Sequence, residues 1–318
     1  MLRRHLAAAG ALASLLLAAA LLAPAVLRGQ QAVAVCGEVP GGVAMDGATA
    51  VLSSMQADSP GPAPTAPGGS ETWRPNPTAF AAVLDRTGAT IEMARFTTNF
   101  RHASPSQAAN IALTARKLTG KVVAPGAVFS YIQATGPYTE AGGYGWGRQF
   151  VGDRIVPTIG GGVCQGASTL YNVVLLADLP VVERHQHGLV VPYLPPGRDA
   201  TVTESGSLDF RFRNNTGGPL VLWGQAVDRE LTLAIFGTKV PPRVTIHTEI
   251  LSRSHYRTEY IDAPNLPAGT SEVVAPGQDG AVSDTWLEIQ TPSGTVRRNL
   301  GRDTYRSSPR IVRRGTGP

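Results

Sequence analysis

The chain has 318 residues, and its 28 lysines and arginines outnumber its 23 aspartates and glutamates to give a net charge of +5. Despite this positive charge, the sequence contains no recognisable nucleic-acid-binding motif. Its glycine run at residues 160–162 also lacks the Gly-Lys-Ser/Thr that follows in a phosphate-binding loop. These features argue against nucleic-acid partners and against nucleotide chemistry.

Residues 1–34 predict a signal peptide or an N-terminal membrane anchor. Arg3 and Arg4 precede an apolar run over residues 6–27, and a basic start before a hydrophobic stretch is typical of a segment that directs export. Small residues suit cleavage at 23–25 or 32–34, while the length of the run also suits a membrane span. Both outcomes place the rest of the chain outside the cytoplasm, either secreted or anchored to the membrane by this segment.

Residues 35–77 predict a stalk and a linker rich in proline and glycine. The segment has too few large apolar residues to bury a core. It contains Cys36, one of the two cysteines of the chain. Outside the cytoplasm Cys36 could form a disulfide with Cys164, which would remove a reactive thiol, and the sequence leaves this pairing open.

Residues 78–238 predict a domain with its own core. Ser104 and Pro105 indicate the start of a helix that ends at Gly120. Residues 209–213, 220–223 and 231–236 have strand patterns and are expected to pair antiparallel. We therefore expect an α+β fold, in which a cysteine-bearing helix packs on an antiparallel sheet, followed by a small all-β module.

Cys164 follows the glycine run and precedes residues 166–177, which predict a helix. The first backbone N–H groups of a helix carry partial positive charge and have no partner within the helix. Such a position lowers the pKa of a thiol and favours the thiolate, which is the nucleophilic form. Cys164 is therefore the candidate nucleophile, with backbone N–H groups near Cys164 and Gln165 as candidates to bind an oxyanion.

His185 and His187 lie two positions apart in a segment predicted to be a strand, so they are expected to share a face. A proline-rich turn then leads to Asp199. The order Cys, His, Asp is that of a transglutaminase-like or papain-like thiol site, where the imidazole takes the thiol proton and the carboxylate orients the imidazole. Of the two candidate bases, His187 is favoured because Gly188 leaves room beside its ring, and His185 remains the alternative.

The same residues also fit a second interpretation, a metal site. A His-x-His pair followed by a carboxylate is reasonable ligand chemistry for zinc, with His185, His187 and Asp199 as the ligands. No other cofactor is expected.

Many short motifs between about residues 95 and 237 resemble the VanW-like domain. They are Pro125-Gly126-Ala127-Val128-Phe129-Ser130, Gly136-Pro137, Gly142-Gly143-Tyr144, Gly160-Gly161-Gly162-Val163-Cys164-Gln165, Thr169-Leu170-Tyr171-Asn172, Glu183-Arg184-His185, His187, Tyr193, Pro196-Gly197-Arg198-Asp199 and Asn214-Asn215-Thr216. The family takes its name from glycopeptide (vancomycin) resistance clusters, and the resemblance implies an exported cell-envelope protein.

These motifs and the glycine-aromatic loop at residues 142–147 supply the candidate binding residues, because glycines there admit close approach of a ligand. The candidates are Gly161, Gly162, Gln165, Tyr171, Asn172, Arg184, Arg198, Tyr144 and Trp146.

Residues 239–318 resemble a G5 domain in Pro276-Gly277-Gln278-Asp279-Gly280, in Ser293-Gly294 and in the ending Pro309-Arg310-Ile311-Val312-Arg313-Arg314-Gly315-Thr316. The resemblance implies a small all-β module that binds the cell wall or its sugars. The arginines near the C-terminus are also expected to attract anionic wall polymers or lipid headgroups.

Three functions remain open at this point. The first is an exported cell-envelope enzyme acting on peptide or amide bonds of peptidoglycan through Cys164, as an amidase, peptidase or acyl-transferase. The second is a non-enzymatic protein that binds peptidoglycan or another wall polymer. The third is the zinc site described above.

Overall fold

The computed structural model describes residues 70–151 and 154–318. The predicted signal peptide or anchor, most of the stalk and linker, and Cys36 lie outside the described residues. Within the described ranges no helix is long and apolar enough to cross a membrane. These residues all belong to one compact unit.

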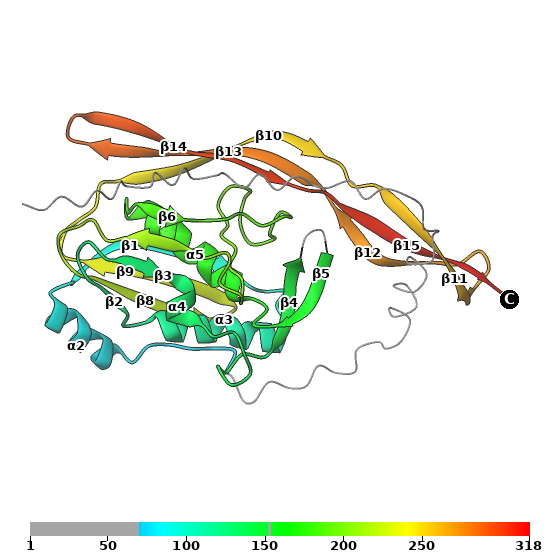
Figure 1. The fold of residues 1–318 in the computed structure, drawn as a ribbon, viewed down its shortest axis with the longest axis horizontal. Coiled ribbons are helices and arrows are strands. Elements are labelled where there is room, and N and C mark those ends of the chain that lie inside the picture. Colours follow the sequence, from blue (N-terminus) through cyan, green and yellow to red (C-terminus); the bar gives the residue numbers. More distant parts are fainter. Residues whose placement is uncertain (1–69, 152–153) are drawn as a thin grey trace, which may run out of the picture. The chain divides into compact units, whose positions relative to one another are not determined.

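The described chain is mostly β-strand with a few helices (Figure 1). The helices are α2 (Pro77–Thr87), α3 (Pro105–Leu118), α4 (Tyr131–Thr135) and α5 (Val163–Leu176). The strands of the first region are β1 (Ile91–Asn99), β2 (Val122–Val123), β3 (Val128–Ser130), β4 (Trp146–Val151), β5 (Arg154–Ile159), β6 (Val181–Glu183), β7 (Arg211–Arg213), β8 (Leu220–Val227) and β9 (Glu230–Gly237).

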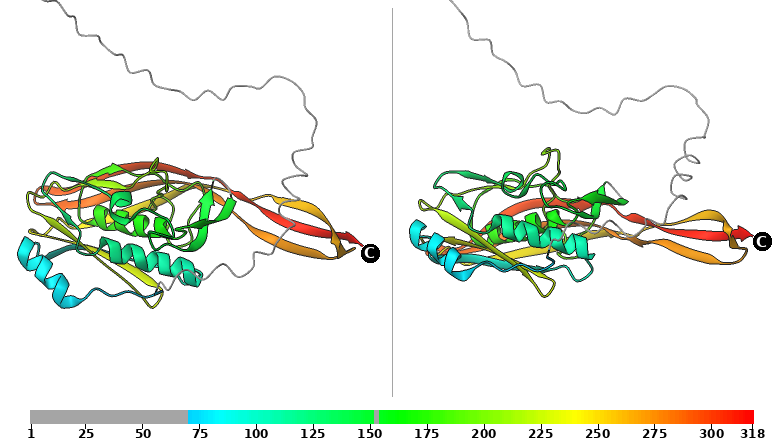
Figure 2. Two further views of the ribbon diagram at one scale, coloured as in Figure 1. Left: turned by 60° about the horizontal axis from the view of Figure 1, so that its bottom comes forward. Right: turned by 90° about the horizontal axis from the view of Figure 1, so that it is seen from below.

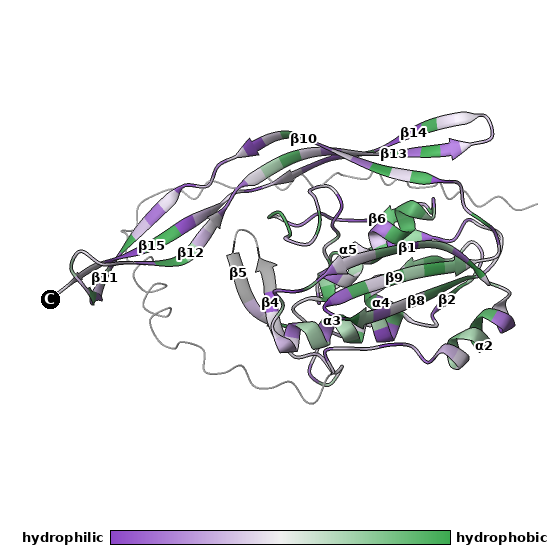
Figure 3. Ribbon diagram, turned by 180° about the vertical axis from the view of Figure 1, so that it is seen from behind, coloured by the Kyte–Doolittle hydropathy of each residue, from purple (hydrophilic) through white to green (hydrophobic). Residues whose placement is uncertain are grey.

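An antiparallel sheet in the order β1-β9-β8-β2 forms the centre of the first region. Both α3 and α5 pack against this sheet, α3 on β8 and β9, and α5 on β1 and β9. The strands contain hydrophobic residues, coloured green on β8 and β9 in Figure 3, and Leu220, Leu222, Leu231 and Leu233 are buried in the shared core. Burial of these faces is what holds the two helices in place.

Helix α3 follows its sequence signals closely. The side chain of Ser104 accepts a hydrogen bond from the backbone N–H of Gln107, and Pro105 occupies the first turn, where its missing N–H costs nothing. The prediction of this helix is confirmed.

The segment that carries both histidines differs from the prediction. Only β6 is a strand, and the chain is irregular from Arg184 to Asp199, so the expected shared face of His185 and His187 is wrong. The segment is held by hydrogen bonds that do not belong to a β-sheet. The N–H of Thr201 donates to the carbonyl of His185, and the N–H of His187 donates to the Asp199 carboxylate. Asp199, which follows the proline-rich turn, lies in a loop.

The C-terminal region is all-β, as predicted. Its strands are β10 (Val244–Ser254), β11 (Thr258–Pro267), β12 (Ser271–Gln278), β13 (Gly280–Thr291), β14 (Gly294–Tyr305) and β15 (Ser308–Gly317). They form two three-stranded sheets, β10-β13-β14 and β11-β15-β12, which follow one another along a narrow ribbon (Figures 1 and 2). Leu287 and Ile289 of β13 enter the core of the preceding region, and β10 contacts α5, so the first of these sheets packs directly on the first region.

Candidate active site

Glycines form the turn that places Cys164 at the start of α5. Gly162 is the residue before the helix and has φ of 107°, a conformation that residues with a Cβ rarely adopt. Cys164 is therefore in the first turn of α5, half-buried and a free thiol. Its own N–H has no carbonyl partner among the described residues, whereas the N–H of Gln165 donates to the carbonyl of Gly162 at 3.0 Å. Of the two candidate oxyanion donors, only the Cys164 N–H is therefore available to donate a hydrogen bond to an oxyanion.

His187 joins Cys164 to a buried carboxylate. The side chains of Cys164 and His187 form a hydrogen bond. On the other side of the ring, Nδ1 lies 2.5 Å from Oδ2 of Asp199. Because an ionised carboxylate only accepts hydrogen bonds, Nδ1 is the protonated nitrogen of this pair, which leaves Nε2 to face the thiol.

The two partners change each other's proton affinity. Burial raises the pKa of the Cys164 thiol, but the hydrogen bond and charge of His187 outweigh it and leave the pKa below its ordinary value of 9.0. Burial lowers the pKa of His187, but hydrogen bonds to Asp199 and Cys164 raise it to about 9. Both shifts favour a thiolate beside an imidazolium.

Asp199 is fully buried and needs several donors to remain charged. Its Oδ2 accepts both Nδ1 and the backbone N–H of His187, the latter at 2.7 Å. Its Oδ1 accepts the hydroxyl of Tyr305 at 2.5 Å and Arg184 at 3.2 Å. Burial raises the pKa of Asp199, but these hydrogen bonds and the charges of His187 and Arg184 leave it below its ordinary value of 3.8.

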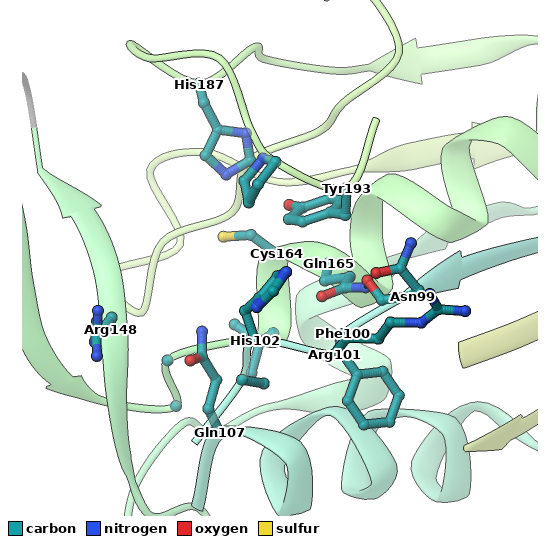
Figure 4. Close-up of a pocket in the computed structure, with 16 residues that line it drawn as sticks. Asn99, Phe100, Arg101, His102, Gln107, Arg148, Cys164, Gln165, His187 and Tyr193 are labelled. Atoms are coloured by element: carbon teal, nitrogen blue, oxygen red, sulfur yellow. The ribbon is translucent and has the colours of Figure 1, made fainter. Parts of the chain in front are cut away.

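A cavity of about 240 Å³ opens above the thiol. Cys164, Gln165 and His187 lie on its wall together with residues from the turns after β1 and β5. Figure 4 shows Cys164 between the rings of His187 and His102, with Tyr193 beside them. Arg148 of β4 and Gln107 of α3 line the opposite side. The thiol is therefore accessible to a ligand, while its histidine is 95% shielded.

The other histidine lies away from this arrangement. Nε2 of His185 is 3.1 Å from Oε1 of Glu183, and the side chain is 41% exposed. His185 does not line the cavity. In the described part of the chain no group of three or more His, Cys, Asp and Glu side chains is arranged to hold a metal ion, including the predicted set with His185.

The predicted binding residues divide into two groups. Gly161, Gly162 and Gln165 line the cavity. The remaining candidates lie elsewhere: Tyr144 is buried and donates to the carbonyl of Thr135, Trp146 is exposed on β4, and Tyr171, Asn172, Arg184 and Arg198 lie behind the site.

Three residues of the second group hold the loop that carries Asp199. The Asn172 side chain accepts from Nε of Arg198 at 2.7 Å and donates to the Arg198 carbonyl at 2.8 Å. Nε of Arg184 donates to the backbone carbonyl of Asp199. These side chains therefore fix the position of the carboxylate, and their contacts with a ligand would be indirect.

Sequence reasoning missed residues that the fold brings to the site. His102 follows β1 and lines the cavity, with no pattern in the sequence to mark it. Asn110 of α3 donates to the carbonyls of Gly145 and Gly161 and accepts from the N–H of Gly145, so it joins the β4 turn to the glycine turn before α5. Tyr305 comes from β14 in the C-terminal region, where the sequence motifs and the arginines did not point to the thiol site.

Comparison with known proteins agrees with these two regions. Residues 106–236 match the family model described as VanW like protein, and residues 244–317 match the G5 domain model. The uncharacterized protein YoaR of Bacillus subtilis is 35% identical over 151 residues, which is 48% of this chain and 50% of that protein. The vancomycin B-type resistance protein VanW of Enterococcus faecalis is 26% identical over 178 residues, 52% of this chain and 64% of that protein. The chain thus matches less than two thirds of the length of either relative.

Two solved structures resemble part of this chain. The G5 domain of an IgA1 protease is 25% identical and covers 26% of this chain and all of that structure, with a TM-score of 0.18. A structure titled HP0197-G5 is 16% identical and covers 23% of this chain and 99% of that structure, with a TM-score of 0.14. By the family models, residues 106–236 of the chain match VanW like protein and residues 244–317 match the G5 domain.

Proposed function

We propose that this protein is an exported cell-envelope enzyme that cleaves or transfers peptide or amide bonds of peptidoglycan through Cys164. The observation that carries the proposal is the chain of contacts from the Cys164 thiol through His187 to the buried Asp199, at the wall of an open cavity. A lone cysteine in a core would need neither a shielded histidine nor a charged partner behind it.

The chemistry follows from the charges of the pair. The Cys164 thiolate attacks the carbonyl carbon of an amide, and the carbonyl oxygen becomes an oxyanion next to the Cys164 N–H at the start of α5. The imidazolium of His187 then gives its proton to the amine that leaves, and a thioester remains. Water or a second amine attacks the thioester, His187 takes the proton of that nucleophile, and the Cys164 thiolate is released.

The cell wall is the proposed location of this reaction. The match to a G5 domain at residues 244–317 supports binding of the cell wall or its sugars, which the resemblance implies, and one relative carries the name of a vancomycin resistance protein. The predicted export segment at residues 1–34 would bring the chain to the same compartment. A wall polymer containing peptides would be both the partner of the G5 domain and the substrate of the thiol.

The test is the rate at which Cys164 reacts with iodoacetamide as a function of pH. We expect fast alkylation below neutral pH in the wild type, and in His187→Ala we expect the profile of an ordinary thiol. His185→Ala is the matched control, since its side chain faces Glu183 and leaves the profile unchanged. Release of new amine ends from purified peptidoglycan, lost in Cys164→Ala, then identifies the reaction.

An unreactive Cys164, or one that titrates as an ordinary thiol in the wild type, would contradict the enzyme. The non-enzymatic wall-binding protein would then be the better explanation of the same two domains.

A further inference from the structure

The G5 domain contacts the thiol site through its longest strands. Tyr305, the last residue of β14, is only 2% exposed, and its hydroxyl lies 2.5 Å from Oδ1 of Asp199. This is the oxygen of the carboxylate that does not contact His187. A side chain from the second domain therefore completes the hydrogen bonding of the first domain's buried acid.

We propose that Tyr305 is a positioning residue for Asp199, so that the G5 domain is a structural part of the thiol site as well as a wall-binding module. This inference rests on the proposed function above, because it assigns Tyr305 a role in the same Cys-His-Asp arrangement.

The hydrogen-bond direction at Tyr305 is fixed by its neighbours. The backbone N–H of Gly197 donates to the Tyr305 oxygen at 2.7 Å, so that oxygen is already an acceptor. A carboxylate has no proton to give, which means that the Tyr305 hydroxyl must donate to Asp199. The Tyr305 hydroxyl thus connects the backbone of Gly197 to the side chain of Asp199. It thereby restricts rotation of the Asp199 carboxylate about its side-chain bond.

A second residue of β14 supports the same carboxylate indirectly. Asp303 lies two positions before Tyr305 and so shares its face of the strand. Both oxygens of Asp303 are 2.7 Å from Nη1 of Arg184, whose Nε donates to the Asp199 carbonyl and whose Nη2 contacts Oδ1 of Asp199. The strand therefore holds Asp199 directly through a hydroxyl and indirectly through a guanidinium.

The loop that carries His187 is held by the G5 domain on its far side as well. The N–H of Arg306 donates to the carbonyl of Gly188 at 2.8 Å, and the side chain of Gln278 donates to the carbonyl of Val190 at 2.5 Å. Gly197 packs so closely on β13 that a Cβ there would lie 2.1 Å from Oγ1 of Thr285. These contacts leave little freedom for the loop as long as the domain is docked.

The consequence for the site is electrostatic. When the carboxylate is fixed, Oδ2 stays aligned with Nδ1 of His187 and stabilises the imidazolium, which in turn stabilises the thiolate. The other charged or titratable groups facing Asp199 are Arg184, Asp303, Tyr171 and Tyr193. Removing the Tyr305 hydroxyl leaves all four of these groups in the chain, and it also takes away the acceptor of the Gly197 N–H, so the measured change combines the loss of both hydrogen bonds of that hydroxyl.

The experiment compares Tyr305→Phe with the wild type in the full 318-residue chain. Phenylalanine keeps the buried ring and removes only the donor. The first readout is the His187 pKa, measured by NMR, which we expect to fall by about one unit. The second is the pH profile of Cys164 alkylation, whose midpoint we expect to rise by about one unit.

Two control variants separate the effect of the hydrogen bond to Asp199 from a general change in the contact between the two domains. Tyr260→Phe removes a hydroxyl from an exposed tyrosine of the same domain. Arg298→Ala removes an ion pair between β14 and Asp178, at the domain contact but without touching Asp199. Both variants should keep the wild-type pKa of His187 and the wild-type alkylation profile.

A His187 pKa in Tyr305→Phe equal to that of the wild type would overturn the inference, and so would an equal shift in Arg298→Ala. The two proposals fail separately. If Cys164 of the wild type is alkylated with the pH profile of an ordinary thiol, the proposed enzymatic function is contradicted. The His187 pKa reports on the role of Tyr305 whether or not the thiol is reactive.

Discussion

Gly161 and Gly147 approach each other so closely that neither position has space for a side chain. A Cβ on Gly161 would lie 2.4 Å from the carbonyl carbon of Gly147, and a Cβ on Gly147 would lie 2.7 Å from the carbonyl oxygen of Gly161. This contact joins β4 to the turn before α5 and so fixes the position of the first turn of α5, which carries Cys164. The glycine run therefore has a packing role in addition to its place at the cavity.

The first prediction is that Gly161→Ala destabilises the protein by about 3 kcal/mol, because the new methyl group meets backbone atoms that have no room to move. The measurement is the free energy of unfolding from urea titration. Gly206→Ala is the control: a Cβ there meets nothing within 4 Å, and its φ of 73° leaves only the cost of left-handed backbone, about 1 kcal/mol. If both variants lose the same free energy of unfolding, the backbone at Gly147 must move to accommodate the new methyl group at little cost.

The sequence predicts those parts of the fold that depend on neighbouring residues. Ser104 and Pro105 identify the start of α3 because capping is a local interaction. The strand patterns at residues 220–223 and 231–236 likewise identify β8 and β9, although β9 is buried on both faces.

The choice between His185 and His187 could not be predicted with the same certainty. The two rings separate because the chain leaves β6 and curves around Asp199, and that curve depends on hydrogen bonds to residues well along the sequence. The preference for His187 rested only on the glycine after it, whereas in the structure the Asp199 carboxylate determines the direction of the ring.

Tyr305 lay beyond sequence reasoning altogether. It is separated from Asp199 by 106 positions, in a domain that the sequence presents as independent. Only the docking of β10, β13 and β14 against the first domain brings the two side chains together.

The second prediction concerns the pH dependence of the proposed reaction. The rate constant kcat/KM should rise as Cys164 becomes a thiolate, at a pH below 9.0, and should fall again near pH 9 as His187 loses the proton that the leaving amine needs. Because the two groups interact, the two midpoints belong to the pair. The measurement is kcat/KM for a peptide substrate from pH 5 to about 10.5, the ordinary range over which such groups titrate. A rate that continues to rise above pH 10 would mean that His187 does not act as the acid.

The third prediction concerns Arg184, which is 13% exposed and contacts both Asp199 and Asp303. Arg184→Ala removes the cation that two buried carboxylates share, leaving Asp199 only the imidazolium of His187, and should cost about 3–5 kcal/mol of stability. The matched control is Arg302→Ala on β14, which breaks an exposed ion pair with Asp284 of the neighbouring strand β13 and should change little. Differential scanning calorimetry of the two variants gives the comparison, and a small loss in Arg184→Ala would mean that water enters and solvates the two acids.

The fourth prediction is that Asp199→Asn destabilises the protein in a pH-dependent way. The pKa of Asp199 is lowered on folding, so the stability it contributes is fully present above its ordinary value of 3.8 and is lost as the pH falls through the lower folded value. We expect a loss of about 3 kcal/mol near neutral pH, where the imidazolium of His187 and the guanidinium of Arg184 lose a buried anion. The difference between wild type and variant should shrink below pH 3.8, as the wild-type carboxyl is protonated too. Urea titrations at several pH values measure this difference, and a loss that stays constant from neutral to acid pH would mean that the hydrogen bonds at Asp199, and not its charge, stabilise the fold.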